Sequence, residues 1–156
     1  HSNIYKNRDD INAVAHAHPM YGKTFSTLGK TLDPITQDSC AFYERTAIFA
    51  DYDGVANGPQ EGINISKALA DKDFLILQNH GILTTGSMID TTIWYFLNME
   101  DACKSQLIAE SVGKPIKIPH DVACKTRDYV ANDLSAFVSL QPLLDLLWEE
   151  EKDFLD

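Results

Sequence analysis

The stretch KDFLILQNHGILTTG, residues 72–86, limits the possible folds more than any other part of the chain. Residues 74–77 are continuously apolar, which is typical of a strand in the interior of a sheet. The Asn79-His80-Gly81 turn follows, and residues 82–86 then read as a second short strand. The pattern predicts a protein built around a sheet, with two short strands joined by this turn.

The remaining segments alternate between strand and helix patterns. Further strands are expected at residues 12–17 and 46–50, and the pieces that follow the Asp33-Pro34 turn read as short strands. Residues 51–58 read as a loop rich in Asp, Gly and Asn. Helices are expected at residues 1–8, 20–28, 59–70, 87–111, 120–134 and 140–152. This order predicts an α/β fold with several antiparallel strands and helices packed on the sheet.

The longest predicted helix has a start signal and an apolar periodicity. Ser87 followed by Asp90 resembles a capping box, in which the two side chains would satisfy backbone groups at the helix start. Apolar residues recur largely at spacings of three and four, which predicts that they form the buried face. These residues are Ile89, Ile93, Phe96, Leu97, Cys103 and Leu107.

Size and charge exclude several classes of function. The 156 residues fit a single domain, and 23 acidic residues against 13 basic ones give a formal charge of −10. This balance argues against binding to nucleic acid or to an anionic membrane surface, because both need basic patches. The acidic residues of the tail LDLLWEEEKDFLD read as the solvated side of a terminal helix. No apolar run reaches the roughly 20 residues that span a bilayer, so membrane insertion is not expected.

The three cysteines indicate a reducing compartment. Cys40, Cys103 and Cys124 are odd in number, widely spaced and without a C-x-x-C pair, so neither a disulfide framework nor a thiolate metal site is expected. Each is interpreted as a small buried apolar residue. We therefore expect a cytoplasmic protein.

Two histidines lie one residue apart at the end of the first strand. Residues i and i+2 of a strand project to the same face, so His16 and His18 should lie side by side. Two unpartnered imidazoles would be costly there, whereas a bound cation would satisfy both. His80 supplies a third candidate, because it lies where a buried strand leaves the sheet, and Gly81 permits a tight turn beside it, including at positive φ. His1 and His120 read as surface residues.

Three imidazoles on one cation are typical of a catalytic zinc site, which keeps one coordination position open. Such an ion can polarise a carbonyl group or stabilise a developing enediolate oxygen. Zinc is favoured, and Mn²⁺ and Co²⁺ are alternatives. The chain is too short for a metallo-hydrolase barrel, and it contains no G-x-S-x-G, P-loop or G-x-G-x-x-G motif.

Together, INAVAHAHPMYGKTFSTLG and FLILQNHGILTTG resemble the class II aldolase/adducin superfamily over about residues 1–111. PITQDSCAFY and FADYDG are more similar to the adducin-like, eukaryotic branch than to the bacterial sugar-phosphate aldolases. The resemblance implies a three-layer α/β/α fold around a mostly antiparallel sheet, with His16, His18 and His80 as metal ligands. It also implies retro-aldol cleavage, epimerisation or decarboxylation of a small hydroxylated substrate through a metal-stabilised enediolate, in a homo-oligomer that is commonly a tetramer.

Family features that would complete such a site are not found in this sequence. The acidic general acid/base and the phosphate-binding loops of sugar-phosphate aldolases belong upstream of His1, so no catalytic base is assigned. The tyrosine that a neighbouring subunit contributes in those enzymes is not transferred to Tyr129, which lies inside a predicted helix. Residues 1–156 are accordingly expected to be one domain of this family that lacks its N-terminal part.

Three interpretations of the sequence stay open. The first is a metal-dependent lyase of the aldolase or decarboxylase type that acts on a small hydroxylated carbonyl or carboxylate compound. The second is a non-enzymatic, adducin-like binding or scaffold domain with a retained or vestigial metal site. The third is an α/β domain in which the three histidines are hydrogen-bonded core residues.

Overall fold

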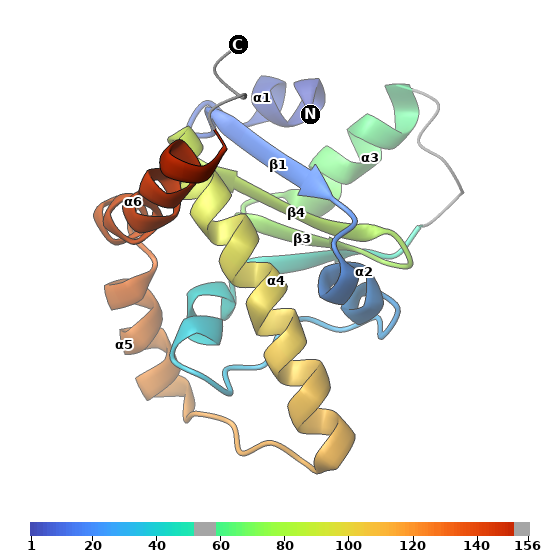
Figure 1. The fold of residues 1–156 in the computed structure, drawn as a ribbon. Coiled ribbons are helices and arrows are strands. Elements are labelled where there is room, and N and C mark those ends of the chain that lie inside the picture. Colours follow the sequence, from blue (N-terminus) through green and yellow to red (C-terminus); the bar gives the residue numbers. More distant parts are fainter. Residues whose placement is uncertain (52–58, 152–156) are drawn as a thin grey trace.

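The computed structural model describes residues 1–51 and 59–151. Its elements, in chain order, are α1 Ser2–Asn7, β1 Ala13–Ala17, α2 Met20–Ser26, the 3₁₀ helix η1 Asp38–Phe42, β2 Thr46–Phe49, α3 Pro59–Leu69, β3 Phe74–Leu77, β4 Gly81–Gly86, α4 Ile89–Val112, α5 His120–Val130 and α6 Asp133–Glu150 (Figure 1). Most of the loop expected at residues 51–58 lies outside the described residues. Within the described ranges, none of the helices combines the length and apolar character that a membrane crossing requires.

The four strands form one sheet in the order β1-β4-β3-β2. β4 pairs antiparallel with both β1 and β3, whereas β2 pairs parallel with β3. The mostly antiparallel sheet inferred from the resemblance is therefore confirmed. β3 is an interior strand and is buried along its whole length, as its continuous apolar run predicts.

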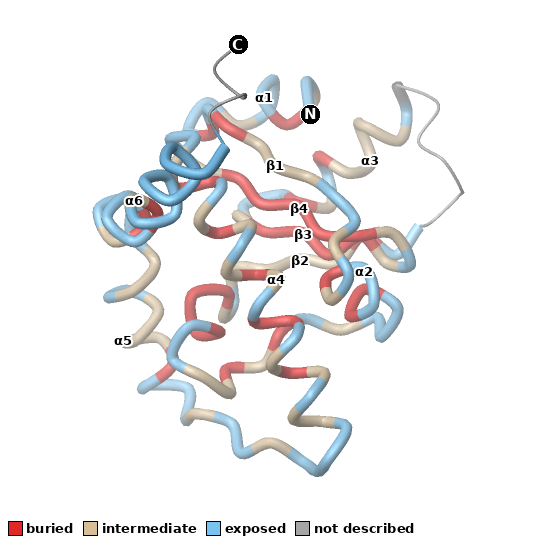
Figure 2. Tube along the Cα trace, in the orientation of Figure 1, coloured by how far each residue is buried: buried red, intermediate tan, exposed pale blue. Residues whose placement is uncertain are grey.

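Alternate residues of the strands enter two separate cores. Phe74 and Ile76 pack with Phe25 and with Met99 of α4 on one face of the sheet. Leu75 and Leu77 pack on the other face, with residues of α1 and α3 such as Ile4 and Leu69. Figure 2 shows the resulting buried layer along β3 and β4, between helices on both sides. The arrangement is the three-layer α/β/α fold.

The segment after the Asp33-Pro34 turn differs from the prediction. Residues 38–42 form η1 rather than a strand. The Ser39 hydroxyl accepts hydrogen bonds from the backbone N–H groups of Ile35 and Thr36, and the Thr36 hydroxyl accepts one from the Ser39 N–H. Such local side-chain bonds favour a turn over an extended ladder.

The start and the buried face of α4 also differ from the predictions. The helix has Met88 at its N-cap without a side-chain cap, and the Ser87 hydroxyl donates instead to Asp133 of α6. Ile89, Ile93 and Leu97 are exposed. The face against the sheet is formed by the buried residues Thr91, Thr92, Tyr95, Met99, Ala102, Cys103 and Gln106. Of the predicted residues, Cys103 is buried and Phe96 and Leu107 pack against the core, so periodicity alone identified only part of the buried face.

The boundary between the last two helices is set by a cap. The Asn132 side chain accepts a hydrogen bond of 3.0 Å from the Ser135 N–H. α6 therefore begins at Asp133 rather than near residue 140, and α5 ends at Val130 rather than near residue 134.

Candidate metal centre

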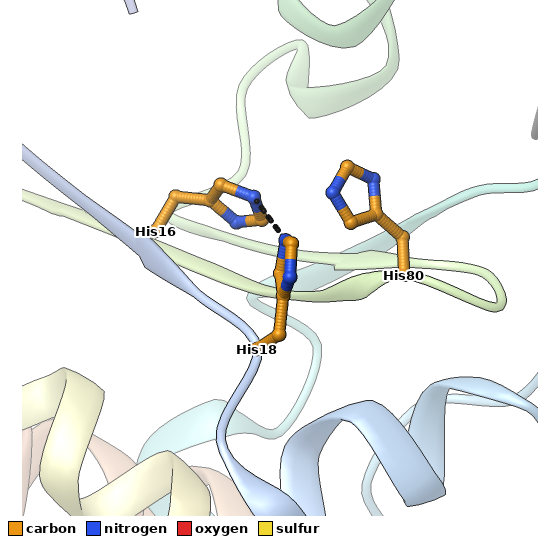
Figure 3. Close-up of side chains that lie close together, drawn as sticks. All are labelled: His16, His18 and His80. Carbon is orange, nitrogen blue, oxygen red and sulfur yellow. Dashed lines mark hydrogen bonds between the residues drawn. The ribbon is translucent and has the colours of Figure 1, made fainter. Parts of the chain in front are cut away.

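The three predicted histidines come together at one end of the sheet. His16 lies on β1 opposite Leu83 of β4, His18 follows one residue after the end of β1, and His80 directly precedes β4. Because β1 and β4 are antiparallel neighbours, the end of one strand lies beside the start of the other. The ring centroids are 5.0 Å apart for His16 and His18, 5.0 Å for His16 and His80, and 4.5 Å for His18 and His80 (Figure 3).

The ring nitrogens are spaced as donor atoms on one cation. The Nε2 atoms of His16 and His18 are 3.2 Å apart, and one nitrogen from each ring can be chosen so that all three lie within 4.8 Å of one another. Two imidazole nitrogens at about 2.0–2.1 Å from a tetrahedral zinc ion are roughly 3.3–3.4 Å apart. The pair formed by His16 and His18 has this spacing, and a nitrogen of His80 lies near enough to join them at one ion after a rotation of its ring.

The protonation of His16 suits metal binding. Its Nδ1 lies 2.9 Å from the carbonyl oxygen of Ile82, which can only accept, so Nδ1 carries the hydrogen and Nε2 presents its lone pair. Burial lowers the pKa of His16, and the neighbouring imidazoles lower it further. Burial also lowers the pKa of His80, as does the adjacent His18. Both shifts favour the neutral form that binds a metal.

None of the three histidines is a core residue. His16 and His80 are half-buried and His18 is exposed. This burial contradicts the interpretation as core histidines, although His16 is hydrogen-bonded to the Ile82 carbonyl and to His18.

The turn that carries His80 depends on two close contacts. A Cβ atom on Gly81 would lie 2.5 Å from the Ala17 carbonyl oxygen and 2.9 Å from Cδ2 of His18, so only glycine lets β1 approach this closely. Gly81 permits a positive φ but does not adopt one, and the positive φ of this turn is at Asn79, with φ 58°. The buried Ser26 of α2 accepts a hydrogen bond from the His80 N–H at 3.2 Å, which connects α2 to the turn.

A carboxylate that the sequence analysis did not single out fixes the chain just after His18. Glu100 of α4 accepts hydrogen bonds from the N–H groups of Tyr21 at 2.8 Å and Gly22 at 2.5 Å, in the first turn of α2. These groups have no partner within their own helix, and the negative charge complements the helix dipole. The contact joins residues 79 positions apart, so no local sequence signal could have revealed it.

A small pocket of about 220 Å³ adjoins the histidines. Two of its lining residues are His16 and His80, and the rest are His1, Ile4, Gly62, Ile65, Leu77 and Leu83. His1 is exposed, as predicted, but belongs to this lining. Within residues 1–51 and 59–151, no lysine or arginine lines the pocket. It therefore offers imidazoles and an aliphatic wall to a small compound.

Fold and site together define an α/β/α domain with a candidate metal centre of three histidines at one end of its sheet. Residues 1–107 match the model of the class II aldolase and adducin N-terminal domain family, and the chain belongs to this family. It is 35% identical to the decarboxylase NovR of Streptomyces niveus over 153 residues, which are 98% of this chain and 57% of NovR. It is also 32% identical to alpha-adducin of Rattus norvegicus, over 69% of this chain and 14% of the adducin.

Among solved structures, an L-fuculose 1-phosphate aldolase from Glaciozyma antarctica PI12 superimposes with a TM-score of 0.87 and 36% identity. The match covers 98% of this chain and 58% of the aldolase chain. The chain thus spans a little over half the length of NovR and of this aldolase.

Proposed function

We propose that His16, His18 and His80 bind one divalent cation, Zn²⁺ in the first place, and that the protein is a metal-dependent lyase. The observation that carries this proposal is the convergence of three imidazoles, with two ring nitrogens 3.2 Å apart and one nitrogen of the third ring within 4.8 Å of the others. Three protein ligands leave a position for a substrate oxygen, as in catalytic rather than structural zinc sites. Mn²⁺ and Co²⁺ are the alternative ions.

A cation held at this site supplies a Lewis acid that polarises a carbonyl group and stabilises negative charge developing beside it. Other residues of the chain hold the three histidines in position. The Ile82 carbonyl fixes the tautomer of His16, Glu100 holds the start of α2 after His18, and Ser26 supports the turn at His80. No residue is assigned as the general base.

We infer a small hydroxylated carbonyl or carboxylate compound as the substrate, and carbon–carbon bond cleavage of the aldolase or decarboxylase type as the reaction. The small pocket beside the histidines supports the size, and its aliphatic wall without lysine or arginine gives no support for a phosphate group. NovR is named a decarboxylase and the structural relative an aldolase, and both names fit this reaction class.

The test is cleavage or decarboxylation of such compounds by protein loaded with Zn²⁺, Mn²⁺ or Co²⁺. Activity should follow the metal content and should be lost in His18→Ala. A folded protein that binds none of these ions at the three histidines would contradict the proposal.

A second candidate function is a non-enzymatic binding domain, and the similarity to alpha-adducin favours it. In that case a metal-loaded protein would turn over no candidate substrate, and His16→Ala would leave partner binding unchanged. Measuring both properties on the same variant separates the two functions.

We further propose that the protein self-associates, in line with the homotetramers common in the family. α4 leaves Ile89, Ile93 and Leu97 exposed on successive turns, and α6, which packs against α4, also presents apolar side chains. Those of α6 are Leu134, Phe137, Val138, Leu143, Leu144, Leu146, Leu147 and Trp148. Exposed apolar side chains gathered on two neighbouring helices support an interface at this part of the molecule. The three free cysteines fit a cytoplasmic location.

A further inference from the structure

A second group of potential ligands lies where α5 packs against the segment around η1. His120 is the first residue of α5, and Cys124 lies one turn further along the same face. Glu44 reaches them from the turn between η1 and β2. These residues belong to elements that contribute none of the three histidines described above.

The donor atoms of this group are close to one another. Nδ1 of His120 lies 3.6 Å from Oε1 of Glu44 and 3.9 Å from Sγ of Cys124. Sγ of Cys124 in turn lies 3.8 Å from Oε2 of Glu44. A tetrahedral zinc ion with ordinary bond lengths would place such pairs of atoms about 3.4–3.6 Å apart. The observed contacts exceed these values by about 0.2–0.4 Å. Glu44 meets His120 and Cys124 with different oxygens, so its exposed carboxylate must also turn until one oxygen faces both ligands.

We propose that Glu44, His120 and Cys124 bind one divalent cation of the zinc class, which connects α5 to the turn before β2. Thiolate and imidazole ligands favour Zn²⁺, Co²⁺ or Cd²⁺ over Mg²⁺ and Ca²⁺. On binding, the Cys124 thiol releases its proton to solvent and the sulfur donates a lone pair to the ion. A water molecule completes the coordination.

Two neighbours compete with a cation at this site. The Tyr43 hydroxyl lies 3.2 Å from Nδ1 of His120, so either Nδ1 gives up this contact on binding, or the ring binds through Nε2, which lies 3.8 Å from Sγ of Cys124, and Tyr43 keeps Nδ1 as an outer hydrogen-bond partner. The Arg127 guanidinium lies 3.4 Å from Oε2 of Glu44 and competes with a cation for this carboxylate. The affinity should therefore rise when the charge of Arg127 is removed.

The thiol gives this site a signature that the three-histidine centre does not have. Cys40 and Cys103 are buried, and burial raises the pKa of Cys103 to about 12, whereas Cys124 is half-buried. A cobalt–thiolate charge-transfer band in the near ultraviolet therefore reports Cys124. The d–d bands in the visible range report cobalt at either site.

The experiment is a titration of the purified protein with Co²⁺, in which both spectral regions are followed. We expect the charge-transfer band to disappear in Cys124→Ser and to persist in His18→Ala, which serves as the matched control at the other site. His120→Ala and Glu44→Gln should weaken the affinity measured from this band at least tenfold and several-fold, respectively. Arg127→Gln should strengthen it.

A folded wild-type protein without the charge-transfer band at millimolar Co²⁺ would overturn the proposal. So would a band that survives in Cys124→Ser, or one that is unaffected in both His120→Ala and Glu44→Gln, because a lone thiol would then suffice. If Cys124→Ser fails to fold, the affinity of His120→Ala for Co²⁺ tests the proposal in its place. In addition, Zn²⁺ but not Mg²⁺ should raise the melting temperature of His18→Ala, and this rise should be absent from the His18→Ala/His120→Ala double variant.

Discussion

Nε2 of His16 and Nε2 of His18 face each other across 3.2 Å, while Nδ1 of His16 is occupied by the Ile82 carbonyl. With one nitrogen committed to the backbone, the other nitrogen of His16 is left to point at its neighbour. Because Nε2 of His16 carries no hydrogen, the two nitrogens can be joined by a hydrogen bond from the Nε2–H of His18 or by one cation that binds both lone pairs.

Acidification should destabilise the metal-free protein. Burial holds the pKa of His16 and His80 below the ordinary imidazole value of 6.5, so the unfolded chain takes up protons at a higher pH than the folded protein. The stability that the two groups contribute is present above about pH 6.5 and is lost as the pH falls through the lowered pKa values. Urea unfolding between about pH 7 and pH 5 should show this decrease. The free energy of unfolding should fall less steeply with pH in His16→Gln/His80→Gln than in the wild type. An equally steep fall in that variant would show that these two histidines do not cause it.

Gly81→Ala should disturb both the fold and the centre. The added methyl group would meet the Ala17 carbonyl and the His18 ring, so we expect a loss of about 1–3 kcal/mol in the free energy of unfolding and weaker zinc binding. Thermal unfolding and zinc titration measure the two effects. Gly113→Ala is the control, because nothing lies within 4 Å of the position of its Cβ. If the two variants behave alike, the close approach of β1 at Gly81 is not important.

Glu100→Ala should destabilise the protein by about 1–3 kcal/mol, because two N–H groups at the start of α2 lose a charged acceptor. Zinc affinity should fall as well, since α2 begins directly after His18 and Pro19. Chemical denaturation and zinc titration measure both. Asp101→Ala, which removes an exposed carboxylate from the same helix, should change stability by less than about 0.5 kcal/mol. Equal effects of the two substitutions would refute the capping role.

Ile93→Glu/Leu97→Glu should convert an oligomer into a smaller species, because two charges would be buried in the proposed interface. Light scattering coupled to size-exclusion chromatography gives the mass directly. Ile116→Glu, at an exposed position between α4 and α5, should leave the mass unchanged. A monomeric wild-type protein, or an unchanged mass in the double variant, would show that Ile93 and Leu97 do not lie in an interface between copies of this chain.

The interior strand, the pair of His16 and His18, and the position of His80 at a strand end could each be predicted because their signals are local. The apolar run of β3 and the two-residue spacing of His16 and His18 each follow from strand geometry. The buried face of α4 could be predicted only in part, because Ile93 and Tyr95 are both apolar and only the position of the sheet decides which of them is buried. The Glu100 contact and the Glu44, His120 and Cys124 group also escaped the sequence analysis, since both depend on contacts between distant segments.

The central claim is that His16, His18 and His80 bind one metal ion. The most direct measurement is the anomalous diffraction of crystals grown with Zn²⁺, recorded on both sides of the zinc absorption edge. We predict a peak about 2.0–2.1 Å from one ring nitrogen of each of the three histidines. Ordered rings of these residues without a shared peak between them would contradict it.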